Sequence, residues 1–387
     1  MIKTIKIRLK PNNKQQTKMF QFANAKRFAY NWALAKQQEN YINGGKFIQD
    51  NELRKQFTLF KKQEENKWLY SISNNVTKQA IKDACISYKR FFKGYSKFPK
   101  FKSKKHDRPS FYVDNIKIKI TDNHVKLENI ATSKKKNKAK LNWVRLYEKN
   151  KIPTNCKYIN PHIVYDGEHW YLCVGIEYQN NINLPVNEGI GVDLGIKDLA
   201  ICSDKHTYKN INKTNRIKKL LKKRRRLQRQ ISKKYFINKR GGRYYKTSNI
   251  VKSEKRLLKV NHRLTNIRNN YLHQVTSEIV KRKPSFITIE DLNVSGIMKN
   301  KHLSKAIQEQ SFHKFRRQLE YKCKWNNIEL RIVDRFYPSS KLCHNCGCIK
   351  SDLKLSDRVY KCDCGYIEDR DYNASLNLRD AKIYKTA

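Results

Sequence analysis

Gly191-Val192-Asp193-Leu194-Gly195 is the stretch that decides the fold of this chain. One aspartate lies within an apolar, β-branched run, which is the pattern of a buried strand. An unpaired charge is costly to bury, so a carboxylate in such a place indicates a functional use. Ile287-Thr288-Ile289-Glu290 repeats the arrangement, because an acidic residue again ends an apolar strand. Asp369-Arg370-Asp371-Tyr372 is the third acidic stretch, and residues 373–378 after it have the pattern of a helix start.

Asp193, Glu290 and Asp371 follow the order of the acids in an RNase H-like fold. In that fold the first acid lies on the central opening strand, the second closes a later strand and the third starts a late helix. Three carboxylates that converge from such places can hold Mg²⁺, a hard cation that prefers oxygen ligands. Two Mg²⁺ ions about 3.5–4 Å apart activate a water molecule and stabilise the leaving oxygen of a phosphodiester. Gly191 and Gly195 would let a phosphate backbone come close to the strand.

Each acid also has a purely structural interpretation. Asp193 could be a turn residue, Glu290 a charge at a strand end and Asp371 a helix cap. Asp291 competes with Glu290 for the metal, but neighbouring residues of a strand point to opposite faces, and we favour Glu290. Asp369 is expected to support the turn before Asp371. The metal-binding interpretation depends on the three acids occurring in this order, with a cysteine cluster just before the third.

That cluster predicts one structural Zn²⁺. The pairs Cys343-x2-Cys346 and Cys362-x-Cys364 are separated by fifteen residues. Two thiolate pairs on facing turns supply the four tetrahedral ligands of a closed zinc site. The chain shows no export signal, so clustered thiols favour metal binding over disulfides. The alternative is a set of unconnected thiols.

The second cysteine pair is C-x-C, which departs from the more usual C-x2-C spacing. Cys348 and His344 are therefore possible substitute ligands. Gly347 and Gly365 follow the two pairs and permit the sharp turns that such loops need.

The charge of the chain indicates a polyanionic partner. Of 387 residues, 85 are Lys or Arg and 33 are Asp or Glu, which gives a formal net charge of +52. No apolar run approaches the roughly 18 residues needed to span a bilayer, and the N-terminus has no signal-peptide core, so we expect no membrane partner. A nucleic acid is the expected partner, and the spread of the charge favours a stably bound RNA.

Residues 205–253 contain no Asp or Glu at all. The segment includes Lys222, Lys223, Arg224, Arg225 and Arg226, yet its apolar residues keep a helical spacing. With the helix that follows, it predicts a basic helical hairpin over 210–282. Charge runs are usually solvated faces. Because this one has a single sign over 49 positions, we favour a nucleic-acid-binding surface.

The N-terminal half combines strands with helices. Residues 2–9 alternate like a strand, and the apolar residues of 12–95 have the spacing of a small helical bundle. From Phe111 the period changes to two, and Ile116, Ile118 and Ile120 predict a half-buried strand. Tyr165-Asp166-Gly167 predicts a hairpin turn.

These patterns predict an α/β multidomain protein. A β-barrel is expected from residues 1–10 and 111–182, with a helical domain at 11–110 inserted into it. Leu184-Pro185-Val186-Asn187 is the expected boundary, and 186–387 would form the nuclease domain with a zinc-binding insertion at 341–366.

The motifs resemble the TnpB (OrfB) family of transposon-encoded proteins. The similarity is most specific over 189–198 and 289–292, and over 337–347 through 369–374, where Tyr337-Pro338-Ser339-Ser340-Lys341 precedes the first cysteine pair. The resemblance implies an RNA-guided endonuclease that cuts double-stranded DNA beside a short adjacent motif. Its RuvC-like site would use two Mg²⁺, and its partners would be a structured guide RNA and the target DNA. A monomer in the prokaryotic cytoplasm, associated with the nucleoid, is expected.

The resemblance also assigns residues. The catalytic acids of the family fall on Asp193, Glu290 and Asp371, and its zinc ligands fall on the four cysteines of the two pairs. The barrel would be a wedge domain, and the helical domain would recognise the adjacent motif. Asn74, Asn75 and Lys78 lie in the corresponding helix and are candidates for base or phosphate contacts.

Three other functions are compatible with parts of the pattern. A miniature type V CRISPR-associated effector would keep the same acids and cysteines, and the DNA next to the gene would separate the two. A guide-dependent DNA-binding repressor is disfavoured because all three acids are present. A transposase that joins DNA ends by itself could use the same acids, so there the resemblance decides.

Overall fold

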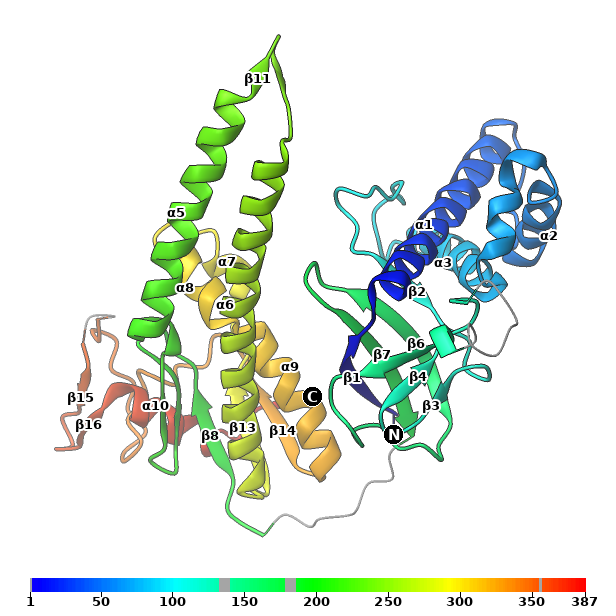
Figure 1. The fold of residues 1–387 in the computed structure, drawn as a ribbon. Helices are drawn as coiled ribbons and strands as arrows, with labels where there is room; N and C mark the ends of the chain where they lie inside the picture. Colours follow the sequence, from blue (N-terminus) through cyan, green and yellow to red (C-terminus); the bar gives the residue numbers. More distant parts are fainter. Residues whose placement is uncertain (1, 132–139, 178–185, 355–356) are drawn as a thin grey trace. The chain divides into compact units, whose positions relative to one another are not determined.

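The computed structural model describes residues 2–131, 140–177, 186–354 and 357–387. The chain divides into two compact units, Met1–Gln179 and Asn180–Ala387 (Figure 1). The boundary expected at Leu184-Pro185-Val186-Asn187 begins outside the described residues, as do the last residues of the predicted barrel segment. Val186 and Asn187 already pair with the second unit, since both backbone N–H groups donate to the carbonyl of Lys283.

The first unit contains one seven-stranded sheet with the order β2-β6-β7-β1-β5-β4-β3. The first strand, β1, pairs antiparallel with both β5 and β7 and buries Ile7 and Leu9. No hydrogen-bonded ladder joins β2 to β3 within the described parts of the chain, so closure into a barrel stays a prediction. The strands are β1 (Ile2–Lys10), β2 (Ser110–Tyr112), β3 (Lys119–Ile120), β4 (His124–Lys126), β5 (Trp143–Leu146), β6 (Tyr158–Tyr165) and β7 (Trp170–Glu177).

The strand predicted around Ile116, Ile118 and Ile120 is wrong over its first half. Only Lys119–Ile120 is a strand, and the side chain of Ile116 is 89% exposed. The Asp114 carboxylate accepts hydrogen bonds from the backbone N–H groups of Ile116 and Lys117, at 3.0 and 3.1 Å. Such an Asx turn offers the backbone a local alternative to a sheet ladder, and alternating hydrophobicity does not reveal it.

Helices of the first unit lie in the chain between β1 and β2. They are α1 (Asn13–Ile42), α2 (Asp50–Phe60), the 3₁₀ helix η1 (Glu64–Ser71) and α3 (Asn74–Phe92), with a short η2 (Lys140–Asn142) later. Asn12 and Gln15 form a capping box that starts α1. The helices and the sheet share one hydrophobic core, because residues from β1, α1, α3 and β7 belong to the same buried cluster.

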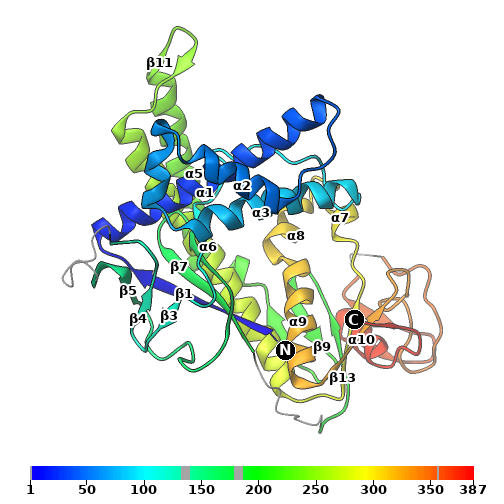
Figure 2. The same ribbon diagram turned by 90° about the vertical axis from the view of Figure 1, so that its right-hand side faces the viewer.

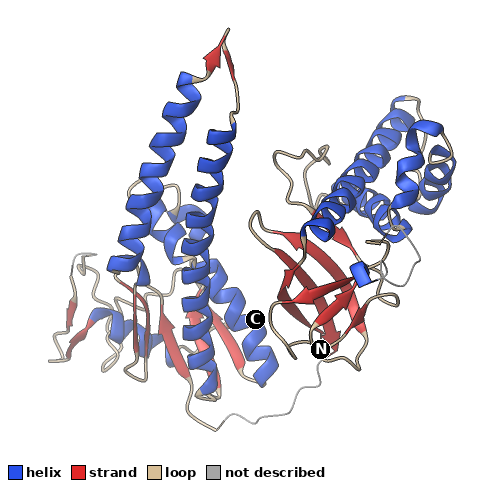
Figure 3. Cartoon of the chain, in the orientation of Figure 1, coloured by secondary structure: helices blue, strands red, loops and turns tan. Residues whose placement is uncertain are grey.

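The second unit is built on a six-stranded sheet with the order β10-β9-β8-β13-β14-β17. Three central strands, β8, β13 and β14, run parallel, while β9 and β10 return antiparallel on one side. Figure 3 shows these strands with helices packed beside them. The strands are β8 (Ile190–Asp193), β9 (Asp198–Cys202), β10 (Thr207–Lys209), β13 (Phe286–Glu290), β14 (Glu329–Val333) and β17 (Lys385–Thr386).

Two long helices of this unit form the predicted hairpin, which is confirmed. α5 (Asn215–Ile237) and α6 (Ser248–Lys281) pack through Ile217, Leu227, Val260 and Leu264. A two-stranded tip, β11 (Lys239–Arg240) and β12 (Arg243–Tyr244), joins them at the far end from the sheet (Figure 1). A short η3 (Ile211–Lys213) precedes α5. No described helix is long and apolar enough to span a bilayer.

The remaining helices cover the sheet of the second unit. α7 (Val294–Ile297) and α8 (Ser304–Gln310) lead into α9 (Phe312–Asn326), which packs on α6 and β14 (Figure 2). The small hairpin β15 (Val359–Lys361) and β16 (Ile367–Asp369) precedes the last helix, α10 (Arg370–Arg379). α10 packs directly on β8.

Candidate nuclease site and cysteine cluster

Two of the predicted acids end neighbouring parallel strands. Asp193 is the last residue of β8, and Glu290 is the last residue of β13. The two parallel strands are in register, with Val192 opposite Ile289. The two acids therefore lie side by side at the C-terminal ends of these strands. Apolar residues before each acid form the buried core, which fixes both strands.

The third acid is brought to the same region by α10. Asp371 is the second residue of this helix, and the helix packs on β8. Asp369 caps the helix, because its carboxylate accepts the backbone N–H groups of Asp371 and Tyr372 at 2.9 and 3.1 Å. The prediction that Asp369 supports the turn is therefore confirmed.

Gly191 makes the contact between α10 and β8 possible. A Cβ atom at this position would lie 2.0 Å from the carbonyl oxygen of Ser375 and 2.4 Å from the backbone nitrogen of Arg379. The expectation that Gly191 leaves room for a phosphate backbone is therefore wrong, because α10 fills that space. The glycine instead lets the helix that carries Asp371 approach the strand that carries Asp193.

Burial and neighbouring carboxylates raise the pKa values of two of the acids. Asp193 keeps some accessible surface, but protein atoms surround its carboxyl group; this desolvation, with the charges of Asp371 and Glu290, raises its pKa to about 7. Desolvation and the charge of Asp291 raise the pKa of Glu290 to about 7. Raised pKa values in a cluster of acids are typical of functional sites.

The carboxylates are less tightly gathered than the cysteines. Across the described residues, the only set of three or more metal-ligand side chains with all ligand atoms within 4.8 Å is the cysteine set. Asp371 is instead held by Arg370, whose guanidinium lies 2.8 Å from the carboxylate, and by Arg358 at 3.7 Å. Arg370 also lowers the pKa of Asp193, although the acidic neighbours outweigh it.

Asp291 has a different environment from Glu290. Its carboxylate accepts a hydrogen bond from Arg316 at 2.5 Å and one from Arg335 at 3.2 Å. The hydrogen bond from Arg316, together with the positive charges of both arginines, holds the pKa of Asp291 below its usual range. Of these two neighbouring acids, Asp291 is paired with arginines, and Glu290 has no ion pair among the described residues. Glu290 is therefore the better candidate for a metal ligand.

The donor set fits Mg²⁺. Three oxygen ligands on a strand end, a parallel strand end and a helix start suit a hard cation, and a bound cation would offset the repulsion that raises the pKa of Asp193. A concavity of about 430 Å³ opens beside Asp371. Two cations, Lys197 and Lys205, line it together with the carboxylates of Asp198, Glu368, Asp369 and Asp371.

Four cysteines gather where the turn that joins β15 to β16 meets the loop that follows Leu342. The Sγ atoms of Cys343 and Cys364 are 3.7 Å apart, and those of Cys346 and Cys362 are 3.5 Å apart. A tetrahedral Zn²⁺ with bonds of about 2.3 Å requires sulfur separations of about 3.8 Å, so the four thiols fit this ion. Gly347 and Gly365 have φ angles of +76° and +85°, which confirms the predicted turns.

The possible substitute ligands lie outside the cluster. Cys348 and His344 are not among the side chains whose ligand atoms come together. The backbone N–H of His344 donates to Asn373, and its imidazole lies 3.8 Å from the carboxylate of Asp380. The cysteine cluster therefore consists of the four predicted residues.

Two buried asparagines connect the cysteine cluster to the acids, and the sequence reasoning did not identify them. Asn373 and Asn377 lie one turn apart on α10, and both donate to the carbonyl oxygen of Leu342, at 2.8 and 2.7 Å. Asn377 also donates to the carbonyl of Ser339 at 2.8 Å. Their spacing of four residues in a helix next to Asp371 is the signal that could have indicated a shared role.

The predicted nucleic-acid-binding residues are mostly at the surface. Of the five basic residues in 222–226, four are exposed and Arg224 is half-buried. On α3, Lys78 is exposed, while Asn74 accepts a hydrogen bond from Lys61 and Asn75 donates one to Glu128. Their contacts with nucleic acid stay predictions.

Three family models match the chain. They are a helix-turn-helix domain of OrfB_IS605 over residues 1–46, OrfB_IS605, described as "Probable transposase", over 172–301, and the Cas12f1-like TNB domain over 312–378. The last covers the cysteine cluster and most of α10.

Relatives extend this similarity over the whole length. The protein named "Putative RNA-guided DNA endonuclease InsQ" of Escherichia coli K12 is 28% identical over 97% of this chain and 91% of its own length. A "Putative RNA-guided DNA endonuclease" of Streptomyces pristinaespiralis is 27% identical over 100% of this chain and 90% of its own. A solved structure, "Cryo-EM structure of CRISPR-Cas12f Ternary Complex", aligns over 96% of this chain and 82% of its own with 16% identity and a TM-score of 0.41. The two OrfB_IS605 models and the full-length relatives together support a protein of the TnpB (OrfB) family.

Proposed function

We propose that this chain is an RNA-guided endonuclease of a transposable element that cuts double-stranded DNA beside a short adjacent motif. The observation that best supports this proposal is the placement of Asp193, Glu290 and Asp371 around one region of negative charge. The net charge of +52 supports nucleic acid as the substrate and partner. Full-length relatives named RNA-guided DNA endonucleases support the guide.

In this proposal the three carboxylates would hold two Mg²⁺, and these ions would supply an activated water and stabilise charge on the leaving oxygen. Asp193 and Glu290 are fixed by the sheet, and Asp371 is carried by α10. Lys197 and Lys205 line the concavity beside Asp371 and would bind phosphates of the strand to be cut. Arg370 neutralises part of the charge of Asp371.

One structural Zn²⁺ on Cys343, Cys346, Cys362 and Cys364 completes the proposed site. Its role is positional. The loop that carries Cys343 is hydrogen-bonded to Asn373 and Asn377, and these residues belong to the helix that carries Asp371. The zinc site thereby sets the position of the third acid.

The deciding experiment measures guided cleavage and guided binding in parallel. The protein is reconstituted with the RNA that copurifies from its own locus and is given a matched target next to a library of flanking sequences. Asp193→Ala, Glu290→Ala and Asp371→Ala should each reduce cleavage by several orders of magnitude and leave DNA binding nearly unchanged, because each removes a carboxylate that positions the cations. Ca²⁺ should support binding but little cleavage, since its coordination is looser.

Asp291→Ala and Asp369→Ala are the matched controls. Asp291 is paired with two arginines and Asp369 caps α10, so their loss should affect cleavage mildly. Near-normal cutting by Glu290→Ala together with an inactive Asp291→Ala would reverse the assignment of the second ligand. Normal cutting by all five variants would refute the nuclease site.

The same experiment separates the alternative of a miniature CRISPR effector. The copurifying RNA would then map to a CRISPR array, whereas a transposon nuclease should carry RNA from the end of its element. An RNA-bound protein that binds targets without any cutting by the wild type would favour a repressor.

A further inference from the structure

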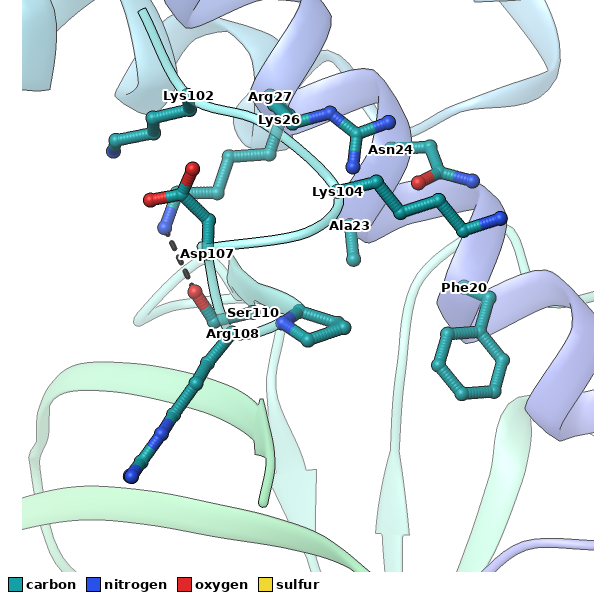
Figure 4. A pocket seen from close by; sticks show the side chains of 11 residues that line it. Phe20, Ala23, Asn24, Lys26, Arg27, Lys102, Lys104, Asp107, Arg108 and Ser110 are labelled. Carbon is teal, nitrogen blue, oxygen red and sulfur yellow. Dashed lines mark hydrogen bonds between the residues drawn. The ribbon is translucent and has the colours of Figure 1, made fainter. Parts of the chain in front are cut away.

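A second cationic concavity lies in the first unit, far in sequence from the proposed nuclease site. It has a volume of about 340 Å³, within the range of small-ligand pockets. Helix α1 forms one wall, and the loop before β2 forms the other (Figure 4). Five cations line it, and they are Lys26, Arg27, Lys102, Lys104 and Arg108. Asp107 is the only carboxylate in the lining.

The loop that forms the pocket is fixed in place. Asn31 on α1 both donates to the carbonyl of Lys102 and accepts its N–H, each at 2.8 Å. The carboxylate of Asp107 accepts the backbone N–H of Ser103 at 2.5 Å, which closes the loop on itself. These bonds bring basic residues from two distant segments to one pocket before any ligand binds.

The cations of this pocket form no close ion pair, although Asp83 and Asp107 act on Lys26 and Lys102 from a greater distance. None of the five forms an ion pair in the parts of the chain that the structure describes. Lys26 donates to the hydroxyl of Ser110 at 2.9 Å, and the ammonium of Lys102 lies 3.6 Å from the ring centre of Tyr30. In Figure 4 the polar ends of Arg27, Lys104 and Asn24 point to the same side of the pocket, above Phe20.

Burial makes the unpaired charge costly. It lowers the pKa of Lys26, and it lowers the pKa of Lys102, on which the charge of Lys26 acts in the same direction. Asp83 and Asp107 oppose the shift at both lysines without removing it. An anion in the pocket would offset this repulsion, and a phosphate group offers oxygen acceptors to Arg and Lys donors at once.

We propose that this pocket binds a backbone phosphodiester of nucleic acid, with Arg27 and Lys104 as its main ligands and Lys26 as the charge behind them. Asn24 can donate to the same group from the neighbouring turn of α1. The inference rests on the proposed function in one respect, because the guide RNA or the target DNA would supply the phosphodiester. It gives the first unit a fixed phosphate contact that is distinct from the predicted contacts of Asn74, Asn75 and Lys78.

The local test is lysine footprinting of the wild-type protein. Acetylation by an N-hydroxysuccinimide ester is compared with and without the copurifying RNA, and then with and without duplex DNA added to the RNA-bound protein. Lys104 should be protected in one of these steps, and the step identifies RNA or DNA as the source. Exposed Lys149, outside the pocket and outside α3, is the control within the same unit.

The second test is the salt dependence of binding. Arg27→Gln/Lys104→Gln should weaken binding about tenfold and reduce the slope of log K against log salt by about one, because one phosphate contact is lost. Lys62→Gln/Lys149→Gln removes the same charge from exposed positions outside the pocket and outside α3, and should change neither the affinity nor the slope. If the double variant fails to fold, the single variant Lys104→Gln is measured in its place, because it replaces only an exposed loop residue.

The inference would be overturned if the pocket and control variants bound both RNA and DNA with the same affinity and salt slope, and if neither nucleic acid protected Lys104 from acetylation. If the wild type still carries RNA and cuts DNA, the proposed function survives that result. If the wild type carries no RNA and does not cut, the proposed function fails instead, and random-sequence duplex DNA then tests the pocket, since phosphate contacts need no guide.

Discussion

Two carboxyl groups of the second unit, those of Asp193 and Glu290, are buried where their charged forms are disfavoured. Asp193 and Glu290 both have a pKa raised to about 7, so at neutral pH each lies near the point where it gains or loses a proton. Folding tolerates this because the strands that carry them are fixed by a buried apolar core. Such a site favours cation binding, since a cation restores the charged form of each carboxylate.

Lys322 on α9 permits a pH test of the fold that does not involve metals. Its ammonium donates to the carbonyl of His273 and to the hydroxyls of Thr276 and Ser277 on α6, at 2.9, 2.6 and 2.8 Å. Burial nevertheless lowers its pKa to about 8. The unfolded chain, with a pKa near 10.5, therefore holds a proton between pH 8 and 10.5 that the folded chain has lost.

We expect the contribution of Lys322 to stability to rise as pH increases through this window, because the unfolded state binds more protons there. Below pH 8 both states are protonated, and the contribution stays constant. Lys322→Met should remove a pH-dependent difference on the order of 1 kcal/mol, since solvent partly screens such a group. Denaturant unfolding of the wild type and of Lys322→Met at pH 7.5 and pH 10 measures the free energy of unfolding of each. If the difference between the two proteins is the same at both pH values, the prediction is contradicted.

At the scale of elements, the contact between α10 and β8 controls the geometry of the acids. The helix approaches the strand without an intervening side chain at Gly191. Asp371 and Asp193 therefore depend on each other through backbone packing, not through a side-chain bond.

Gly191→Ala tests this contact. Its Cβ would meet backbone atoms of α10 at 2.0 and 2.4 Å, so the helix must move away from the strand. We expect a loss of stability of about 1–3 kcal/mol or more from overpacking, and cleavage reduced by at least tenfold while RNA binding persists. Gly195→Ala is the control, because its Cβ would meet only the carbonyl of Asp198 at 3.1 Å. Equal activity of the two variants would show that the contact does not position Asp371.

The cysteine cluster acts on the same helix from its other side. Asn373 and Asn377 tie α10 to the loop at 339–342, which leads directly into Cys343. Loss of a closed metal site removes folding energy from the segment that it holds.

Removal of zinc by a chelator, followed by Mg²⁺ in excess, should therefore abolish cleavage while leaving the first unit folded. Hydrogen exchange should show faster exchange over 341–378 and little change over 2–131. Zn²⁺ should restore both protection and cleavage, whereas Cys343→Ser should not be restored. Full cleavage by metal-analysed, zinc-free protein would contradict the positional role of the cluster.

At the scale of the whole molecule, the dominant feature is the positive charge. The exposed face of α5 concentrates much of it, while the apolar face packs on α6. A hairpin with these two faces can hold a polyanion along its length without giving up its own core.

Replacing Lys222, Lys223, Arg225 and Arg226 by Gln should weaken RNA binding and lower the salt slope by about three, at roughly 0.7–0.9 per lost phosphate contact. Arg224 is left in place because it is half-buried. The control removes four exposed lysines elsewhere, Lys62, Lys82, Lys149 and Lys382. RNA binding measured across a salt series decides it, and equal slopes for both quadruple variants would exclude the hairpin as the RNA-binding surface.

The sequence by itself determined the features that local patterns encode. Apolar runs predicted the strands that end at Asp193 and Glu290, helical spacing predicted the α5–α6 hairpin, and cysteine spacing predicted the four thiols that come together. Each of these depends on periodicity or spacing within one segment. The wedge and recognition roles of the first unit, and the catalytic roles of the acids, stay predictions.

Only the tertiary structure decided which distant segments meet. It assigned Gly191 to the packing of α10, ended the expected strand at Ile116 with an Asx turn, and joined α1 to the loop before β2 around one cationic pocket. It also placed Asn373 and Asn377 between the cysteines and the acids. Hydrophobic periodicity tells which face of an element is buried, but not which element covers it, because that choice depends on packing between segments far apart in the chain.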